Sequence, residues 1–414
     1  MRFHPTNWIK GNKSNCLEGK TIVIGITGSI AAVRVIELSR ELIRHGADVY
    51  AVMTKDAEKI IHPEALKYAT GNEVISEITG NVEHVEFCGL NGNADLYVIA
   101  PATANTISKI ACGIDDTPVT TFATTAIGSK IPILIVPAMH EAMYSHPGVI
   151  ENINKLKSWD ITILEPNLEE GIAKIVSNQN ILLHAERLIY SKAKFSRKLI
   201  ITSGPTLEYL DPIRAITTLA SGKTGNELAK EAFRRGYEVF LVHKNKLGLN
   251  GINEIIVNTS EEMIEAVINE LDKGGYDAVI SAAAISDFYI ESYPKKIKSS
   301  NPMEIKMFPS IKLIDKIKKQ YPEIFLVAFK AETGIRTEEL IDISINRMKE
   351  SNADMIIAND VINKGMGTND NEVYIISKDH TIQQVNGSKR EIAESIFNCI
   401  DTYFNGEYDL FAHD

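Results

Sequence analysis

The chain has 414 residues, of which 44% are hydrophobic and 24% charged, and its formal net charge is −10 at pH 7. This balance excludes a fibrous or wholly disordered chain, and at about 150 residues per domain the length suggests two or three domains, of which we expect two. The negative charge argues against a nucleic-acid surface, which needs clustered Lys and Arg. The start lacks the apolar stretch of a signal peptide, no run reaches the roughly 18 apolar residues of a membrane helix, and the four cysteines show no CxxC spacing. We therefore expect a cytoplasmic protein with small-molecule partners.

Short apolar runs alternate with segments of helical periodicity along the first half of the chain. Strands are predicted at residues 21–26, 48–53, 95–100 and 133–136, and a helix at 31–44. This alternation is typical of a parallel sheet wrapped by helices. The segment 190–198 (YSKAKFSRK) is polar and basic, and we interpret it as a linker. The first domain is therefore predicted to cover residues 1–190 and the second residues 191–414.

The same alternation begins again after the linker. Strands are predicted at residues 199–202, 238–242, 278–282, 325–329, 354–358 and 373–376. Each half opens with a strand, a glycine loop and a helix, but no residue-level repeat relates the two halves. The predicted fold class is α/β, with two doubly wound, mostly parallel-sheet Rossmann-like domains.

The loops after the predicted strands of the first half carry residues suited to a ligand. Gly28 and Ser29 stand at the mouth of a helix, where exposed N–H groups favour a phosphate, although any α/β protein needs a glycine at such a turn. The run PATANT follows the third strand, at the edge where open α/β sheets bind ligands. Its Thr103 or Asn105 could instead cap the next helix. The run PAMHEAMY follows the fourth strand, and its methionines fit a core as well as a ligand contact.

In order, GITGSIAA, HVEF, ADLYVIAPATANTISKIACGIDD and PAMHEAMYSHP resemble the flavin-dependent cysteine decarboxylases over roughly residues 18–180. On type alone His84 is a surface imidazole before an acidic stretch, but the resemblance makes it the catalytic histidine. It also implies that Met139 and His140 contact substrate. The implied chemistry is oxidation of the substrate thiol, loss of CO₂ from the resulting thioaldehyde and return of the hydride, with FMN supplying the redox step. The implied FMN contacts are Gly28, Ser29, Ile30, Thr54, Thr103 and Asn105.

Two features depart from that family's pattern. Its PxMNxxM motif places an asparagine on the substrate carboxylate, where this chain has His140, which can still bind an anion as a donor or as an imidazolium. Bacterial members carry a cysteine in a flap over the substrate that donates a proton in the final reduction. The matching stretch 165–175 (EPNLEEGIAKI) contains none, so the sequence leaves the donor for that step open.

The second half opens with SGPT after its first strand, followed by LDPIR and SGKTG. SGKTG is not a P-loop, because GxxxxGK[ST] needs a glycine five residues before Gly222, where Thr217 stands. With AAAISDF, KIK, FKAET and ANDV, in this order, these segments resemble phosphopantothenate–cysteine ligase from about residue 198 onward. In that family, a carboxylate attacks a nucleoside triphosphate and cysteine then displaces the nucleotide, so negative charge must be neutralised throughout.

This second resemblance implies that Lys296 stabilises the first transition state. It also implies that Thr218 replaces an asparagine that contacts the acyl-nucleotide intermediate. On type alone, Lys296 and Lys298 would be a solvated surface and Asp287 a helix cap. Magnesium is implied by the triphosphate, and either CTP or ATP fits. The implied nucleotide contacts are Gly222, Lys223, Gly225, Asp287, Lys296, Lys298, Phe329, Asn359 and Asp360.

Together the resemblances predict a bifunctional enzyme of coenzyme A biosynthesis, with a decarboxylase domain at 1–190 and a ligase domain at 191–414. It would ligate L-cysteine to 4′-phosphopantothenate and decarboxylate the product, 4′-phosphopantothenoylcysteine, to 4′-phosphopantetheine. The implied assembly is a homo-oligomer in which decarboxylase trimers are joined by ligase dimers into a dodecamer.

Three alternatives remain open at the level of the sequence. A nicotinamide-dependent oxidoreductase would need a GxGxxG motif, which follows neither opening strand. A prenyl-transferring relative of the flavin fold is disfavoured by the ligase-like second half. A binding module whose catalytic residues have decayed is favoured by His140, Thr218 and the absent flap cysteine, and disfavoured by His84 and Lys296.

Overall fold

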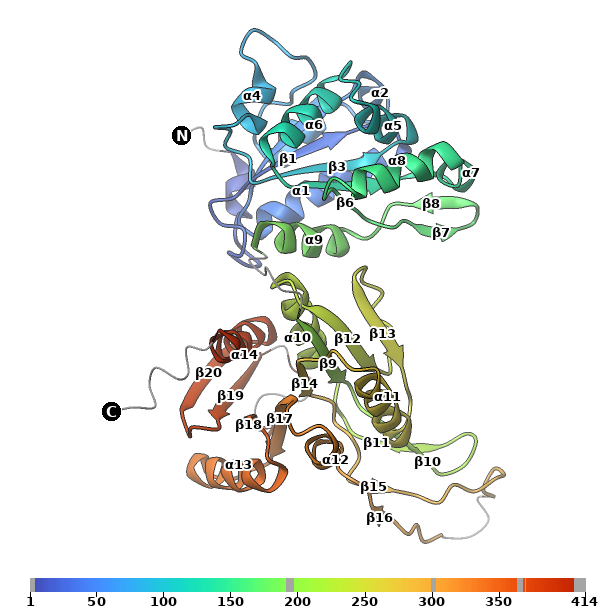
Figure 1. The fold of residues 1–414 in the computed structure, drawn as a ribbon, viewed down its shortest axis with the longest axis vertical. Helices are drawn as coiled ribbons and strands as arrows, with labels where there is room; N and C mark the ends of the chain where they lie inside the picture. Colours follow the sequence, from blue (N-terminus) through green and yellow to red (C-terminus); the bar gives the residue numbers. More distant parts are fainter. Residues whose placement is uncertain (1–3, 191–196, 299–302, 363–367, 369, 406–414) are drawn as a thin grey trace. The chain divides into compact units, whose positions relative to one another are not determined.

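The structure is a computed structural model, and it describes residues 4–190, 197–298, 303–362, 368 and 370–405. The chain divides into two compact units, Met1–Ser191 and Lys192–Asp414, which are described separately (Figure 1). The segment interpreted as a linker falls mainly on residues 191–196, which lie outside the described residues. In the described ranges, no helix combines the length and apolar character needed to cross a membrane.

Unit 1 is built on a five-stranded parallel sheet with the order β2-β1-β3-β4-β6. This flavodoxin-like order reverses between β1 and β3. The four strands predicted for this half are confirmed, because each is an apolar run buried within the sheet. The strands are β1 Thr21–Ile26, β2 Asp48–Met53, β3 Leu96–Ala102, β4 Ile133–Pro137 and β6 Thr162–Ile163.

Helices cover both faces of this sheet, and each face has its own apolar core. One face carries α1 Val35–Arg44, α3 Pro63–Thr70 and α9 Asn178–Tyr190. The other carries α4 Glu83–Cys88, α5 Ala104–Cys112, α6 Pro118–Ser129 and α8 Pro147–Lys157. The shorter helices are η1 Pro5–Trp8, η2 Ile30–Arg34, α2 Lys55–Glu58 and α7 Glu141–Tyr144. The helix predicted at 31–44 is thus a short 3-10 turn followed by α1. A separate three-stranded sheet joins β5 Met139–His140, β8 Ile172–Lys174 and β7 Asn167–Glu169.

Unit 2 contains an eight-stranded sheet with the order β13-β12-β9-β14-β17-β18-β19-β20. From β13 to β18 the strands are parallel and follow the order of a dinucleotide-binding fold, which reverses between β9 and β14. β19 and β20 add an antiparallel edge. The strands are β9 Lys198–Ser203, β12 Glu238–His243, β13 Ile252–Ile256, β14 Ala278–Ser281, β17 Phe325–Glu332, β18 Met355–Asp360, β19 Asp370–Ser377 and β20 Ile382–Ser388.

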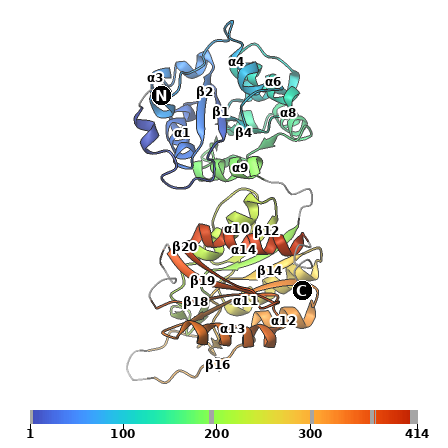
Figure 2. The ribbon, with the colours of Figure 1, turned by 90° about the vertical axis from the view of Figure 1, so that its left-hand side faces the viewer.

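Helices also cover both faces of the sheet in unit 2. On one face lie α11 Ser260–Asp272, α12 Leu313–Gln320 and α13 Thr337–Ser351, and on the other α10 Lys223–Arg234 packs beside α14 Lys389–Phe404 (Figure 2). Two further antiparallel pairs are separate from this sheet: the hairpin of β10 Leu207–Tyr209 with β11 Ala215–Thr217, and the pair β15 Phe288–Tyr289 with β16 Phe308–Pro309. The predicted fold class, two doubly wound and mostly parallel α/β domains, is confirmed.

Candidate active sites

In unit 1, three strand-end loops are joined by hydrogen bonds at the point where the strand order reverses. The buried Thr27 hydroxyl donates to the Pro101 carbonyl oxygen at 2.7 Å and accepts the Thr103 backbone N–H at 3.1 Å. The Ala138 N–H donates to the Ala102 carbonyl at 3.1 Å. The loops after β1, β3 and β4 therefore form one edge, which is where a flavodoxin-like sheet binds its flavin.

The predicted flap, residues 165–175, forms a hairpin of β7 and β8. β8 pairs with β5, which places Ile172 opposite His140. Arg34, the last residue of η2, donates from its guanidinium to the Ile175 carbonyl at 3.2 Å. The hairpin is therefore tied both to the segment predicted to bind substrate and to the one predicted to bind the FMN phosphate.

Three of the residues predicted to contact FMN stand at the starts of helices. The side chains of Thr54 and Thr103 cap α2 and α5 by accepting the backbone N–H groups of Ala57 and Thr106. For Thr103, capping therefore accounts for the position of its hydroxyl oxygen. Ser29 precedes η2, and within the described chain its side chain makes no capping hydrogen bond. Its hydroxyl is thus not committed to the helix start.

The other predicted FMN residues are glycine or exposed. A Cβ at Gly28 would lie 2.6 Å from the Cβ of Asp56, so a glycine is required there. Ile30 is 78% exposed, and Asn105 is also exposed. A close-packed glycine, an uncommitted serine and an exposed amide at this edge fit the phosphate and the polar ring edge of FMN.

His84 lies on α4 and packs against α6. Its ring centroid is 6.5 Å from that of Phe122. Its Nδ1 atom is buried and has no hydrogen-bond partner among the described residues. Leaving such a group unsatisfied costs about 1–3 kcal/mol, so this nitrogen needs a partner, either a water or a bound molecule. A solvated surface imidazole does not account for this nitrogen.

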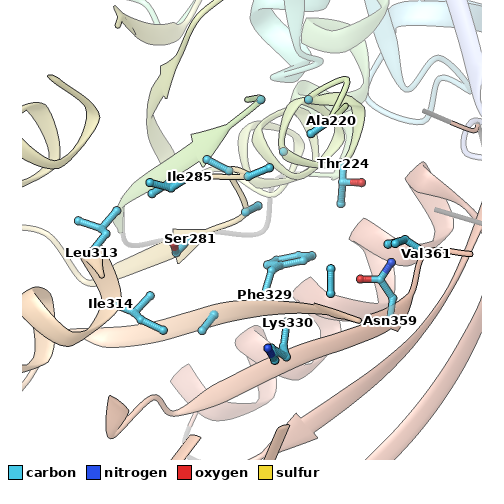
Figure 3. A pocket seen from close by; sticks show the side chains of 18 of the residues that line it. Ala220, Thr224, Ser281, Ile285, Leu313, Ile314, Phe329, Lys330, Asn359 and Val361 are labelled. Atoms are coloured by element: carbon cyan, nitrogen blue, oxygen red, sulfur yellow. The ribbon is translucent and has the colours of Figure 1, made fainter. Parts of the chain in front are cut away.

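In unit 2, a pocket of about 320 Å³ lies at the ends of β9, β14 and β17, beside the point where the strand order reverses (Figure 3). This volume is within the range of small-ligand sites. Figure 3 shows Phe329 and Asn359, from neighbouring strands, facing the space below Thr224 at the start of α10. The predicted nucleotide contacts that line the pocket are Gly222, Lys223, Gly225, Asp287, Phe329 and Asn359.

Two glycines allow the start of α10 to approach the end of β9. A Cβ at Gly225 would lie 2.5 Å from the Cβ and Oγ of Ser203. Gly222 has a φ of +75°, in the left-handed region, and its carbonyl accepts the Ser203 hydroxyl at 2.9 Å. The helix therefore directs its first N–H groups and its positive end at the pocket, which favours an anion.

Asp360, predicted to be a nucleotide contact, lies outside the described pocket lining. Its carboxylate accepts the backbone N–H groups of Ile362 at 2.9 Å and Gly334 at 3.0 Å. These hydrogen bonds hold the pKa of the Asp360 carboxyl below its usual value. The carboxylate is therefore engaged in shaping the loops after β17 and β18.

Lys296, Lys298 and Thr218 also lie outside the lining that the structure describes. The two lysines are exposed on the segment between β15 and β16. Thr218 follows β11, and its Oγ1 is buried without a partner among the described residues. In the described ranges, no group of three or more His, Cys, Asp or Glu side chains is placed to hold a metal ion.

The sequence analysis missed several polar residues of both sites. Lys312, Arg347 and Lys389 line the pocket and come from three different helices or their approaches. Lys389 is only 5% exposed, and its burial, together with nearby Lys223, lowers its pKa. In unit 1 the missed residue is Thr27, which holds two loops together. The three pocket cations stand in no segment whose local pattern marks a site, whereas Thr27 lies within the run GITGSIAA but was not predicted to have a role of its own.

Two family models match the chain: the Flavoprotein model over residues 10–189, and the model for the DNA/pantothenate metabolism flavoprotein C-terminal domain over residues 195–403. The chain is 47% identical over 402 residues to the "Coenzyme A biosynthesis bifunctional protein CoaBC" of Thermococcus kodakarensis, which covers 96% of this chain and 99% of that protein. It is 41% identical to the protein of the same name from Methanocaldococcus jannaschii, over 95% of this chain and 96% of that one. Among solved structures, the C-terminal domain of a CoaBC protein covers 52% of this chain and 98% of its own, at 26% identity and a TM-score of 0.43.

Proposed function

The chain belongs to the family of bifunctional coenzyme A biosynthesis proteins, and from this premise we propose how its two units divide the reactions. The protein joins cysteine to 4′-phosphopantothenate and decarboxylates the product. We assign decarboxylation to residues 1–190 and ligation to residues 191–414. The succession of the two matched family models supports this division and disfavours both a nicotinamide oxidoreductase and a prenyl transferase.

The pocket at the end of β9 is the observation that carries the ligase assignment. We propose that it binds CTP or ATP, with the phosphates at the start of α10. Exposed Lys223 and Lys312 and partly buried Arg347 bring positive charge to the pocket, and cations placed beside a triphosphate neutralise its charge. Phe329 offers a face for the base, and Asn359, which is 8% exposed, offers hydrogen bonds.

We propose that ligation proceeds in two displacements. The carboxylate oxygen of 4′-phosphopantothenate attacks the α-phosphorus and releases pyrophosphate, and the amine of cysteine then attacks the acyl carbon and releases the nucleoside monophosphate. Lys296 stabilises the charge of the first transition state, and Thr218 contacts the acyl-nucleotide. Magnesium arrives with the triphosphate, whose oxygens are its preferred ligands.

For unit 1, we propose that FMN binds where the loops after β1, β3 and β4 meet. When bound, FMN supplies the reversible oxidation of the substrate thiol. Gly28 and Ser29 would hold its phosphate, and Asn105 its polar ring edge. His84 uses its unpartnered Nδ1 to hold or move a proton, and His140 binds the substrate carboxylate beside the β7–β8 hairpin.

We also propose a cytoplasmic homo-oligomer, with decarboxylase trimers joined by ligase dimers into a dodecamer. Ile30 and Val33, in η2 directly after Gly28 and Ser29, are 78% and 51% exposed. Exposed apolar side chains at a ligand edge suit contact with a neighbouring subunit. The location is supported by the four cysteines, which lie far apart in the sequence with no CxxC spacing.

Mass spectrometry of the purified protein with FMN, magnesium, cysteine, 4′-phosphopantothenate and either CTP or ATP tests these assignments. We expect 4′-phosphopantetheine, with the faster of the two reactions identifying the nucleotide. Accumulation of 4′-phosphopantothenoylcysteine alone would contradict the assignment of unit 1. Folded protein that yields no product with either nucleotide would contradict the assignment of unit 2.

A further inference from the structure

The residue between the two lysines of the KIK run is held by two hydrogen bonds. The Ile297 N–H donates to Asp211 Oδ2 at 3.1 Å, and its carbonyl accepts the Arg214 guanidinium at 2.9 Å. The partners are 86 and 83 residues earlier in the chain, in the turn of the β10–β11 hairpin. Both backbone groups of Ile297 are therefore fixed to one turn, although the flanking side chains of Lys296 and Lys298 are exposed.

Asp211 is placed to maintain this contact. It is completely buried, and its other oxygen, Oδ1, accepts the N–H groups of Ile213 and Arg214 at 2.8 Å each. Burial alone would raise the pKa of the Asp211 carboxyl, but the backbone N–H groups, including that of Ile297, and the Arg214 charge outweigh burial and lower it. The carboxylate is therefore ionised at neutral pH and acts only as an acceptor.

A second tie joins the same two segments. The Tyr293 N–H donates to the Leu210 carbonyl at 2.9 Å, next to Asp211. Residues 290–298 form neither helix nor strand, so these ties to the hairpin turn define the course of the segment. An exposed lysine on an untied loop would spread over many positions, whereas a fixed backbone restricts the reach of its ammonium group.

We propose that Asp211 is a positioning residue for ligation, because it fixes the Ile297 peptide and thereby sets where the Lys296 ammonium group stands when both substrates bind. This inference rests on the role proposed for Lys296. Asp211 acts through the peptide rather than on the reacting atoms. The turn and the KIK run thus form one functional element, although the sequence separates them widely.

Asp211→Asn tests this role with little change in shape. The amide oxygen still accepts the Ile213 and Arg214 N–H groups, but its NH₂ group faces the Ile297 N–H, so two donors oppose each other. The assay contains 4′-phosphopantothenate and a saturating nucleotide but no cysteine, so each enzyme molecule releases pyrophosphate once. We expect the rate of this single release to fall about 10- to 100-fold, as for a misplaced catalytic group. The KM for the nucleotide should stay within about twofold, since the pocket lining is unchanged.

A double-substitution cycle separates positioning from general destabilisation. Because Asp211 acts through Lys296, Asp211→Asn should change the rate by less than about twofold when Lys296→Gln is already present. A matched control is Asp354→Asn, which removes another carboxylate of unit 2, one that is 10% exposed and accepts the Leu326 N–H at 2.9 Å. We expect that variant to lower the unfolding temperature and to keep the rate per folded molecule.

Equal rate losses from Asp211→Asn with and without Lys296 would overturn the inference, as would an unchanged rate in the folded single variant. If Lys296→Gln itself keeps the wild-type rate, the role proposed for Lys296 fails first. If Lys296→Gln is slow but Asp211→Asn keeps the wild-type rate, the role of Lys296 stands and only the inference about Asp211 fails. If Asp211→Asn does not fold, Arg214→Gln replaces it in the cycle, because it removes the hydrogen bond to the Ile297 carbonyl. Rate losses from Arg214→Gln and Lys296→Gln that simply add would again overturn the inference.

Discussion

Thr27→Val tests whether the Thr27 hydroxyl holds together the loops after β1 and β3 of unit 1. Valine keeps the shape of the buried side chain but removes the hydroxyl that joins the Pro101 carbonyl to the Thr103 N–H. Each buried group left without a partner costs about 1–3 kcal/mol, so the two together cost about 2–6 kcal/mol unless the loops separate and become hydrated. Separation would open the edge proposed to bind FMN. Because about 1.4 kcal/mol corresponds to a tenfold change in affinity, FMN binding should weaken at least tenfold.

The assay combines FMN titration, followed by the quenching of flavin fluorescence, with thermal unfolding of the full chain. Thr27→Ser is the control, because it keeps the hydroxyl and should bind FMN within about twofold of the wild type. The ligation rate, which depends on unit 2, should be unchanged in both variants. A Thr27→Val protein with the wild-type FMN affinity and unfolding temperature would refute the argument that this hydroxyl holds the loops together.

Three further predictions concern single contacts. Gly225→Ala would place a Cβ 2.5 Å from the Cβ and Oγ of Ser203, a type of overpacking that costs about 1–3 kcal/mol, so nucleotide affinity measured by calorimetry should fall about tenfold. Arg34→Met removes the hydrogen bond to the Ile175 carbonyl, a net contribution of about 0.5–1.5 kcal/mol, and should slow CO₂ release from phosphopantothenoylcysteine while ligation is unaffected. The folded-state pKa of Asp211 lies below its ordinary value of 3.8, so its stabilising effect is present above that pH and is lost as the pH falls through the lower value. Acid denaturation of unit 2, followed by circular dichroism, should therefore be steeper below pH 3.8 in the wild type than in Asp211→Asn.

Matched controls exist for two of these substitutions. A Cβ at Gly80 meets nothing within 4 Å, so Gly80→Ala should leave nucleotide affinity unchanged. Arg40→Met removes an arginine from α1 of the same unit and should leave CO₂ release unchanged. Wild-type nucleotide affinity in Gly225→Ala, or wild-type CO₂ release in Arg34→Met, would show that the contact in question does not support the site. Superimposable acid denaturation curves for the wild type and Asp211→Asn would show that the ionised Asp211 carboxylate does not stabilise unit 2.

The sheets could be predicted because their strands are continuous apolar runs. β1 and β2 begin and end at the predicted residues, and the other predicted strands differ by at most a few positions at their ends. β13 (INEII) and β20 (IQQVNGS) were missed because they are edge strands with few buried residues and no regular alternation of apolar and polar positions. Their place is decided by pairing with neighbouring strands, which the local sequence does not encode.

The sites were predictable where one short segment carries the signal. Gly222 and Gly225 stand in a motif whose order along the chain is informative, and both line the pocket. Thr27 and Pro101 are 74 residues apart, and Ile297 and Asp211 are 86 apart, so no local pattern relates them. The same holds for three pocket cations: Lys312, which precedes α12, Arg347 on α13 and Lys389 on α14. Residues that hold a site together become visible only when the fold brings distant segments into contact.

The division of labour between the two units is tested most directly by giving His84→Asn and Lys296→Gln each substrate separately and following both products by mass spectrometry. We predict that His84→Asn converts 4′-phosphopantothenate and cysteine to phosphopantothenoylcysteine, which accumulates. Lys296→Gln should form this intermediate only at a small residual rate but should decarboxylate it at the wild-type rate when it is added. Equal loss of both activities in either folded variant would contradict two separate sites.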